Sequence, residues 1–506
     1  MSALEVDAIV AVIGAGAMGA GIAQVAAKAG HSVLLFDVNF DAVNQGLEKT
    51  AQGLQKLVSR NKMSQQAVDA LLSRITPCEH LPQLADAKLV VEAVVESLAV
   101  KQSIFSELEG ICDADTIFAT NTSSISITSI ASKLTRPGNL VGFHFFNPAP
   151  IMKLVEVISG IATDKSVAKT LYDTAENWGK TPVLARSTPG FIVNRVARPF
   201  YAEALRVLQE GGADIATIDA TLRDCGGFRM GPFELMDLIG HDVNYAVTRS
   251  VFNAYYQDQR FMPSLLQQEL VNAGFLGKKS GRGFYDYSQG VEALLPNEAD
   301  HQALNGTITI GTGFGVEQGL VDQIINSSMG VEQDDSNAPF IRVGDSCLML
   351  TDGRTATQVS AETNENNIIL FDLCLDFENS KRITVCRSDQ SDEQAFNQAV
   401  AVLQHLGKTV SVIDDVPGMV VMRTVCMLAN EGADAVNQQV CNVESVDLAM
   451  QAGVNYPCGP LRWADNVGVK YVVTVLQNLN TTYAEDRYRV SPLLHRKVHG
   501  GVGFNQ

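Results

Sequence analysis

The sequence feature that most restricts the fold of this chain is a glycine pattern near its start. Residues 8–13 (AIVAVI) predict a short buried strand, and Gly14, Gly16 and Gly19 follow it with the spacing G-x-G-x-x-G. The small residues 20–29 predict a helix. In this setting Gly14 permits a tight turn, Gly16 lets a pyrophosphate approach the backbone, and Gly19 allows close helix packing. The pattern therefore predicts a dinucleotide-binding α/β unit.

An acidic residue after the second expected strand indicates which dinucleotide binds. Residues 32–36 form that strand, and Asp37 follows 18 residues beyond Gly19. A carboxylate at this place accepts hydrogen bonds from the adenosine ribose and repels a 2′-phosphate. NAD is therefore favoured over NADP.

The composition excludes several classes of partner. The 506 residues carry a net charge of -18, which argues against nucleic acid and anionic membranes as general partners. The sequence contains neither an apolar run long enough for a membrane span nor a basic start typical of a signal peptide. Nine cysteines without a C-x-x-C pair indicate a reducing compartment, so we expect the cytoplasm.

Polar residues follow the next two expected strands. Glu96 and Lys101 come after strand 88–93, and Asn121-Thr122-Ser123-Ser124 comes after strand 116–119. Ligands of doubly wound sheets bind beyond the carboxyl ends of the strands, so we expect these residues at the cleft. An equally good interpretation of the NTSS run is a helix N-cap before residues 125–134.

The best candidates for acid–base chemistry lie in residues 143–157, FHFFNPAPIMKLVEV. His144 stands at a strand end, Pro148 and Pro150 mark a turn, and Glu156 lies in a second apolar run. A turn here brings the two side chains together, and the carboxylate would then fix the imidazole tautomer and stabilise the imidazolium. The alternative is a packing histidine among aromatic residues.

Two helical stretches complete this part of the chain. Residues 41–73 predict a helical hairpin whose basic residues Lys49, Lys56, Arg60 and Lys62 form a solvated face or bind the phosphates of an anionic substrate carrier. Residues 191–287 predict a separate all-helical domain. Asn194 lies in its first helix, where an apolar residue would pack better, and this suggests a functional role.

Five separated signatures, in order, resemble the L-3-hydroxyacyl-CoA dehydrogenase family over residues 8–287: NTSS, FHFFNPAPIMKLVEV, TPGFIVNR, MGPFELMD and GKKSGRGFYDY. The resemblance implies NAD-dependent oxidation of the 3-hydroxyl of an acyl-CoA to the 3-ketone. It implies that His144 is the base, that Glu156 orients it, and that Ser123 and Asn194 contact the substrate oxygen or the base. The implied cofactor-site residues are Gly14, Gly16, Gly19, Asp37, Glu96, Lys101 and Asn121. The basic hairpin would meet the CoA anion.

The rest of the chain repeats earlier residues at a constant offset of 228. Gly179-Lys180-Thr181 recurs as Gly407-Lys408-Thr409, Gly231-Pro232 as Gly459-Pro460, and Asp237 as Asp465. A constant offset over this span indicates a second copy of the helical domain.

The second copy lacks the candidate chemistry. At the same offset His144 becomes Asp372, Glu156 becomes Thr384 and Asn194 becomes Met422. Residues 307–315 imitate a strand and a glycine turn without G-x-G-x-x-G. We therefore expect a truncated nucleotide-binding unit that cannot hold a dinucleotide.

The expected fold is an α/β Rossmann NAD-binding domain (1–186), an all-α domain (187–290), a degenerate truncated Rossmann-like domain (291–410) and a second all-α domain (411–506). In the family that the sequence resembles, the helical domain commonly pairs with its twin from another subunit. We expect the second all-α domain to take the twin's place in an intrachain pseudo-dimer, and further homo-oligomerisation stays open.

The substrate is open at this stage. One complete unit with a degenerate copy resembles bacterial family members of phenylacetate catabolism that act on 3-hydroxyadipyl-CoA, with 3-hydroxybutyryl-CoA as the main alternative. A distal carboxylate would need a cation, for which Arg195, Arg198 and Arg229 are candidates. Two other classes compete: a lysine-dependent oxidoreductase of the 6-phosphogluconate or 3-hydroxyisobutyrate type, and a non-catalytic dinucleotide-binding or structural protein.

Overall fold

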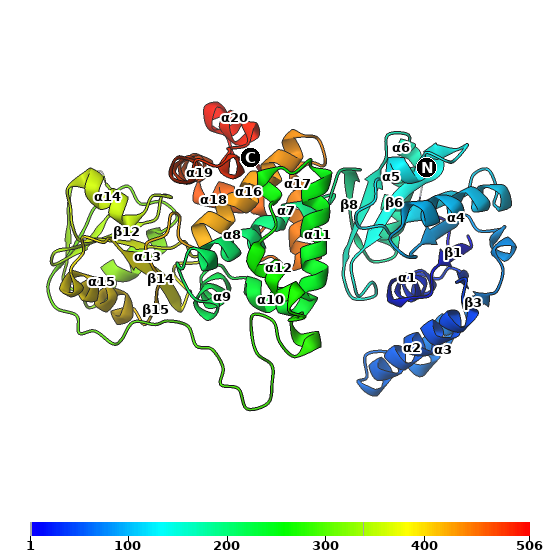
Figure 1. Cartoon of the computed structure of the whole chain (residues 1–506), viewed down its shortest axis with the longest axis horizontal. Helices are drawn as coiled ribbons and strands as arrows, with labels where there is room; N and C mark the ends of the chain where they lie inside the picture. Colours follow the sequence, from blue (N-terminus) through cyan, green and yellow to red (C-terminus); the bar gives the residue numbers. More distant parts are fainter. Residues whose placement is uncertain (1–2, 337, 506) are drawn as a thin grey trace. The chain divides into compact units, whose positions relative to one another are not determined.

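A computed structural model describes residues 3–336 and 338–505. The chain forms two compact units, each described here by itself (Figure 1). The first contains the residues up to 195 together with 438–454, and the second contains residues 196–437 together with those from 455 onward. The four domain boundaries expected from the sequence stay predictions.

The first unit is built on an eight-stranded sheet with the order β3-β2-β1-β4-β5-β6-β7-β8. Its strands are β1 (Val10–Ile13), β2 (Val33–Phe36), β3 (Ile75–Cys78), β4 (Leu89–Glu92), β5 (Ile117–Thr120), β6 (Leu140–Phe145), β7 (Leu154–Ser159) and β8 (Thr181–Arg186). All neighbours are parallel except β6 and β7. The strand order reverses between β1 and β4, which is where ligands of doubly wound sheets bind. The predicted Rossmann fold is confirmed.

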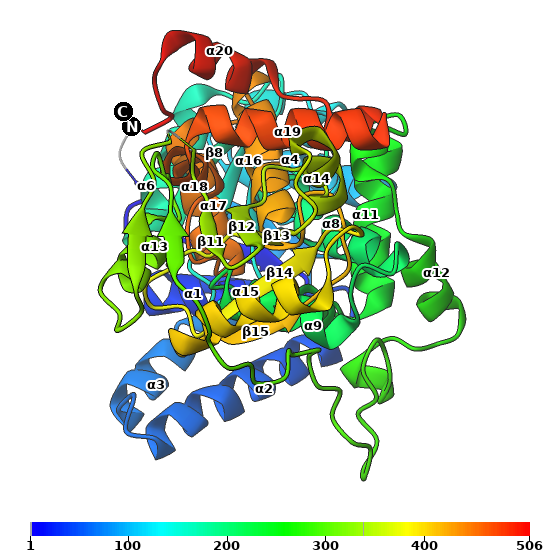
Figure 2. The ribbon, with the colours of Figure 1, turned by 90° about the vertical axis from the view of Figure 1, so that its left-hand side faces the viewer.

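The helices of the first unit surround this sheet. They are α1 (Ala17–Lys28), α2 (Phe40–Ser59), α3 (Gln65–Leu72), α4 (Leu98–Ile111), α5 (Ile127–Ala131), α6 (Lys165–Asn177), α7 (Val193–Val196) and α17 (Val443–Val454), with 3-10 turns η1 (Leu81–Leu84) and η2 (Pro137–Asn139). The expected helical hairpin is present, and Figure 2 shows α2 and α3 running side by side.

Helix α17 comes from the late part of the chain and packs on β7 and β8. A Cβ added at its Gly453 would lie 2.5 Å from a terminal methyl group of Leu154, so a larger residue there would force the leucine side chain to shift. The sequence pattern predicted a helix in this region but gave no sign of the surface on which it packs.

The second unit contains a seven-stranded sheet with the order β10-β9-β11-β12-β13-β14-β15. Its strands are β9 (Ile308–Ile310), β10 (Val331–Gln333), β11 (Ile341–Val343), β12 (Ser346–Leu350), β13 (Ile368–Phe371), β14 (Arg382–Arg387) and β15 (Thr409–Val412). From β12 to β15 the neighbours are parallel, antiparallel and parallel, as from β5 to β8. By contrast, β11 is antiparallel to both neighbours. The strands on the side of the sheet that corresponds to the glycine turn therefore pair differently from those of the first unit. The predicted truncated second copy is confirmed.

The helices of the second unit are α8 (Arg198–Gln209), α9 (Ile215–Asp224), α10 (Pro232–Ile239), α11 (His241–Ala254), α12 (Leu265–Asn272), α13 (Gln318–Ile325), α14 (Ala356–Thr363), α15 (Glu393–His405), α16 (Val421–Asn437), α18 (Pro460–Val467), α19 (Val469–Tyr483) and α20 (Pro492–Gly500), with 3-10 turns η3 (Gln259–Phe261), η4 (Lys278–Ser280) and η5 (Asp486–Tyr488). Helix α16 is almost entirely buried and packs on α8, α18, α19 and α20. Within the described parts of the chain no helix is long and apolar enough to cross a bilayer.

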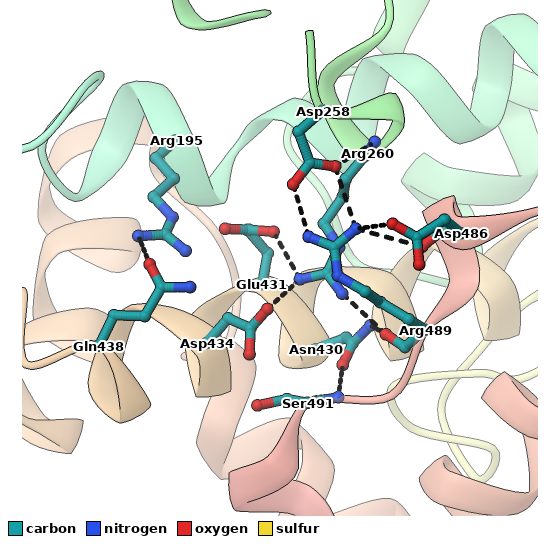
Figure 3. A network of polar contacts seen from close by, with 10 residues as sticks. All are labelled: Arg195, Asp258, Arg260, Asn430, Glu431, Asp434, Gln438, Asp486, Arg489 and Ser491. Carbon is teal, nitrogen blue, oxygen red and sulfur yellow. Dashed lines mark hydrogen bonds and ion pairs between the residues drawn. The ribbon is translucent and has the colours of Figure 1, made fainter. Parts of the chain in front are cut away.

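Reciprocal ion pairs join the two sets of helices within the second unit. Arg487 Nε donates to Glu203 Oε1 at 3.0 Å. Arg260 Nη1 donates to Glu431 Oε2 at 3.2 Å, a pair that Figure 3 shows. Glu203 and Glu431 are equivalent at the offset of 228, and the two arginines lie on the short 3-10 turns η3 and η5. Such reciprocity, in which each copy supplies the cation for the other's carboxylate, is typical of a two-fold interface.

Candidate active site

His144 and Glu156 form a buried pair on neighbouring strands. The antiparallel register of β6 and β7 places the two residues directly opposite each other. His144 Nδ1 lies 2.7 Å from Glu156 Oε2, and His144 is only 5% exposed. A carboxylate accepts hydrogen bonds, so Nδ1 carries the proton and Nε2 of the neutral ring is free to take one.

The second oxygen of Glu156 is held by the start of α7. Glu156 Oε1 accepts the backbone N–H groups of Ile192 at 3.0 Å and Val193 at 3.1 Å. The chain reaches this position through Gly190 and Phe191, both with positive φ (76° and 48°). A positive φ is uncommon for phenylalanine, so the turn is held by its surroundings. Glu156 is therefore fixed before any substrate arrives.

Asn194 is the second residue of α7, and its side chain is partly exposed. It makes no hydrogen bond with any residue that the structure describes, although an amide has both donors and an acceptor. This side chain is therefore available to an external ligand.

Ser123 belongs to a group of residues gathered around Glu96. Glu96 Oε1 accepts Thr122 Oγ1 at 2.6 Å, Ser124 Oγ at 2.8 Å and the Ser123 N–H at 3.1 Å. Burial acts to raise the pKa of Glu96, but these hydrogen bonds and the charge of Lys101 outweigh it and hold the pKa below its usual value. Glu96 thus ties the β5 exit to the β4 exit as a carboxylate.

The interpretation of the NTSS run as the N-cap of the following helix is wrong. Helix α5 begins at Ile127, and its cap is Ser126, whose side chain accepts the N–H of Ser129 at 3.2 Å. The hydrogen bonds of Glu96 explain why residues 121–124 form a turn of their own.

Lys101 is buried and forms ion pairs with two carboxylates. It is 1% exposed, and its Nζ lies 2.6 Å from Glu92 Oε1 and 3.3 Å from Glu96 Oε2. Glu92 also accepts the Thr120 hydroxyl at 2.6 Å. Sequence reasoning missed Glu92, although an acid that ends an apolar strand and is followed by a lysine on the next helix was a usable signal.

Asn121 links two strand ends beside His144. Its Oδ1 accepts the backbone N–H of Phe145 at 2.8 Å, and its own N–H donates to the carbonyl of Glu92. The side chain therefore positions the end of β6, which carries His144.

The glycine turn forms a cradle that fits a dinucleotide phosphate. Gly14 has φ +97°, and a Cβ there would lie 2.5 Å from the carbonyl oxygen of Ala93. A Cβ on Gly19 would lie 1.7 Å from the carbonyl oxygen of Gly14. A Cβ on Gly16 would meet no atom within 4 Å, so this position faces open space at the start of α1. Free N–H groups at such a helix start are suited to a pyrophosphate.

Asp37 lies beside this cradle. Its Oδ2 accepts the N–H of Ala15 at 2.8 Å, and its Oδ1 accepts the N–H of Asn39 at 3.0 Å. Each carboxylate oxygen can accept a further hydrogen bond. Asp37 is therefore held in place and still able to bind ribose hydroxyls.

The second copy uses an aspartate where the first has its histidine. Asp372 accepts the backbone N–H groups of Val420 at 2.9 Å, Val421 at 2.7 Å and Met422 at 2.9 Å. At the offset of 228, Val420 and Val421 correspond to the two residues held by Glu156. Burial raises the pKa of Asp372 to about 6, although these N–H groups oppose the rise. Asp372 thus performs the structural task of Glu156, without a partner imidazole.

Lys180 and Lys408 show a shared structural role. Burial lowers the pKa of Lys180 to about 8. Its Nζ donates to the carbonyl oxygens of Ala149 and Met152, and Lys408 binds the carbonyls of its own equivalent turn. The same arrangement in a copy without the histidine indicates that this lysine holds a turn.

The three candidate arginines lie in different surroundings. Arg195 is buried and donates to Gln438 Oε1 at 3.0 Å (Figure 3). Arg229 is exposed. Arg198 is buried in the second unit, at a pocket described below.

Family models match most of the chain, with residues 288–347 outside the matched ranges. Residues 9–188 match the NAD binding domain of 3-hydroxyacyl-CoA dehydrogenase, and residues 190–287 and 418–503 match its C-terminal domain. Residues 348–417 match the 3-hydroxybutyryl-CoA dehydrogenase reduced Rossmann-fold domain.

Individual relatives share this organisation. The chain is 43% identical over 489 residues to 3-hydroxyadipyl-CoA dehydrogenase of Escherichia coli (strain K12), which covers 97% of each chain. It is also 43% identical to a crystal structure of 3-hydroxybutyryl-CoA dehydrogenase from Escherichia coli K12, with a TM-score of 0.89 over 98% of this chain and 100% of that chain. A probable 3-hydroxybutyryl-CoA dehydrogenase of Bacillus subtilis is 41% identical and covers 55% of this chain and 96% of its own.

Proposed function

This chain belongs to the 3-hydroxyacyl-CoA dehydrogenase family, and from that premise we propose that it oxidises 3-hydroxyadipyl-CoA with His144 as the base. The observation that carries the proposal is the buried pair of His144 and Glu156, with Glu156 anchored to the start of α7. NAD is the cofactor, and when bound it accepts the hydride.

In the proposed mechanism His144 Nε2 takes the proton of the substrate 3-hydroxyl. The imidazolium that forms lies 2.7 Å from the carboxylate of Glu156, which stabilises it. Because the carboxylate already accepts two N–H groups, it does not have to reorient during the reaction.

Two further groups would bind the substrate oxygen. The Asn194 amide has no partner among the described residues and can donate to the 3-oxygen. Ser123 is half-buried, with its N–H fixed on Glu96, and its hydroxyl can donate to the same oxygen. Both donors would stabilise negative charge on that oxygen as the proton leaves.

The cofactor-binding part of the proposal rests on the cradle. Gly14, Gly16 and Gly19 would hold the pyrophosphate, and Asp37 the adenosine ribose. Lys101 and Asn121 would act as positioning residues, because Lys101 holds Glu96 and Asn121 holds the strand end beside His144.

The choice of 3-hydroxyadipyl-CoA is supported by the relative of that name, which matches both copies over nearly the whole chain. Relatives named for 3-hydroxybutyryl-CoA include short and long forms, so this ester is the alternative substrate. We place the reaction in the cytoplasm, because all nine cysteines have free thiols and free thiols are typical of a reducing compartment.

We infer further that the second set of helices takes the place of a partner subunit's helical domain. The inference is supported by the packing of α16 on α8 and by the reciprocal pairs of Glu203 and Glu431. With an interface of this kind inside one chain, the first helical domain would not need to pair with the helical domain of another subunit.

The proposal is tested by NADH absorbance at 340 nm with NAD and a panel of 3-hydroxyacyl-CoA esters. The wild type, His144→Gln and Asp372→Ala are compared with 3-hydroxyadipyl-CoA and 3-hydroxybutyryl-CoA. We expect turnover to be lost by ~10²–10⁴-fold in His144→Gln, which is the usual contribution of a general base, and to be kept in Asp372→Ala. NAD binding without turnover of any ester would contradict the proposal and favour a non-catalytic protein.

A further inference from the structure

The second unit contains a pocket of about 370 Å³ that is not part of the site described above. Helix α8, η3, the following loop and η5 line it. Its polar lining includes four guanidinium groups, from Arg198, Arg206, Arg260 and Arg487. Its apolar lining includes Leu205, Phe261, Met262, Pro263 and Leu265.

Three of the four arginines are neutralised by carboxylates of the protein. Arg206 binds Glu485 through two hydrogen bonds of 2.6 and 2.7 Å. Arg487 binds Glu203 at 3.0 Å. Arg260 binds Glu431 and Asp434, as Figure 3 shows. These three charges belong to the packing of the two sets of helices.

Arg198 differs from the other three. It is 5% exposed, and its Nη1 donates to the Thr248 hydroxyl at 3.1 Å. No carboxylate of the described residues lies within ion-pair distance of it, and its guanidinium carbon lies 4.9 Å from the centre of the Tyr201 ring. Burial lowers the pKa of Arg198, which reflects the cost of a charge without a counterion.

Several donors at this pocket have no acceptor. Arg198 Nε, Arg260 Nε, Arg487 Nη2 and Ser264 Oγ are buried and lack a hydrogen-bond partner. Buried polar groups in proteins are nearly always satisfied, so a group of unmet donors around one pocket indicates a ligand rich in acceptors.

The charge balance selects the kind of acceptor. One uncompensated guanidinium matches a single negative charge, and the acidic lining residues Glu210 and Glu485 disfavour a phosphate dianion. A planar carboxylate accepts two parallel N–H groups from an arginine. The apolar wall beside these donors suits a short hydrocarbon chain.

We propose that this pocket binds a carboxylate on a short aliphatic chain, with Arg198 as its ion-pair partner. At the offset of 228 the second copy has Cys426 in place of Arg198 and Leu476 in place of Thr248, so only the first copy has these donors.

The test compares Arg198→Met with Arg249→Met, which removes an exposed arginine of the same unit outside the pocket. Isothermal titration calorimetry measures the binding of hexanoate and of hexan-1-ol, which has the same chain length but no carboxylate. We expect the affinity for hexanoate to fall by ~100-fold in Arg198→Met, as when one partner of a buried charge pair is lost. Arg249→Met should keep the affinity of the wild type. Equal hexanoate affinity in the wild type and in Arg198→Met would overturn the assignment of a carboxylate to this pocket.

Thermal unfolding is a second measurement that does not depend on the turnover of any ester. It is followed with hexanoate and with hexan-1-ol, which lacks the carboxylate. A rise in Tm with hexanoate that is absent in Arg198→Met supports the pocket, even if the wild type oxidises no ester. We expect Arg198→Met to fold, because removing a buried charge without a counterion does not destabilise a protein. The absence of both hexanoate binding and a hexanoate effect on Tm would overturn the proposal.

Discussion

Glu156 and Asp372 have the same structural role in the two copies, because each accepts backbone N–H groups at the start of a helix. Glu156 has a longer side chain and comes from β7, so its second oxygen reaches His144 on β6. Asp372 follows directly after β13, the strand equivalent to β6, and stands at the sequence position that corresponds to His144. The helix start is thus satisfied in both copies, but the proton acceptor exists in only one.

We expect Glu156→Gln to lower kcat by ~10²-fold, because a neutral amide cannot stabilise the imidazolium. The amide oxygen can still accept the N–H groups of Ile192 and Val193, so the protein should remain folded. Steady-state kinetics at several pH values and a Tm measurement check this. Thr384→Val, at the equivalent position of the second copy, is the control and should keep full kcat. Full activity of Glu156→Gln would remove Glu156 from the mechanism.

Asn194→Ala should lower kcat/KM by ~10²-fold, the usual effect of losing one donor to a developing oxyanion. Its Tm should stay that of the wild type, because the amide has no partner among the described residues. Met422→Ala, the equivalent change in the second copy, should show the reverse, since Met422 is fully buried. A large fall in Tm for Asn194→Ala would indicate a packing role instead.

Asp372 predicts a pH dependence of stability. Its pKa is raised to about 6 in the folded protein, above the unfolded value of ~3.9, so folding favours the protonated form. Its contribution is therefore complete below about pH 4 and is lost as the pH rises through 6, at ~1.4 kcal/mol per pKa unit. Denaturant unfolding measures the free energy of unfolding at several pH values. Between pH 4 and 6 this free energy should change less with pH in Asp372→Asn than in the wild type. Trp463 fluorescence in a Trp178→Phe background reports the second unit alone. The same change of unfolding free energy with pH in the wild type and in Asp372→Asn would contradict the raised pKa.

Helices and strands with strong apolar periodicity were predictable from the sequence, and the hairpin of α2 and α3 is the clearest case. Strand β3 was missed because two of its four residues are exposed and Pro77 interrupts the pattern. The pairing of His144 with Glu156 was predictable, because a proline-containing turn leaves few ways to connect two apolar strands. The docking of α17 on β7 and β8 was not, since periodicity shows which face is buried but not its partner.

Reversing two charges on the hairpin should weaken substrate binding. Lys49 and Lys56 on α2 are exposed and form no ion pair with the described residues. If they meet the CoA phosphates, the double variant Lys49→Glu and Lys56→Glu should raise KM by ~10-fold at low salt, with kcat nearly unchanged and a smaller effect at high salt. Lys133→Glu, a charge reversal at another exposed lysine of the same unit, is the control. Equal KM values in both variants would show that the basic face is only solvated.

At the scale of the whole molecule, a constant sequence offset was enough to predict the duplication. What it could not give was the energetics of the contact between the copies. Glu203 has no solvent exposure and is held between Arg423 at 3.2 Å and Arg487 at 3.0 Å, both from the late part of the chain. Burial acts against its charge, but the two arginines hold the pKa of Glu203 below its usual value. The first set of helices thus depends on cations that it does not contain.

Deleting residues 290–506 therefore tests the role of the second copy. The deletion removes α16, whose buried face covers α8, and leaves Glu203 as an unpaired acid on an apolar surface. It also uncovers β7 and β8 where α17 packs. Breaking a buried ion pair by removing the cation costs ~3–5 kcal/mol, so the fragment should dimerise through its helices or aggregate. Light scattering after gel filtration measures this, with the full chain as reference. A fragment carrying Glu203→Gln lacks the unpaired charge and should aggregate less, whereas a soluble, monomeric and fully active fragment would show that the second copy is dispensable for the fold.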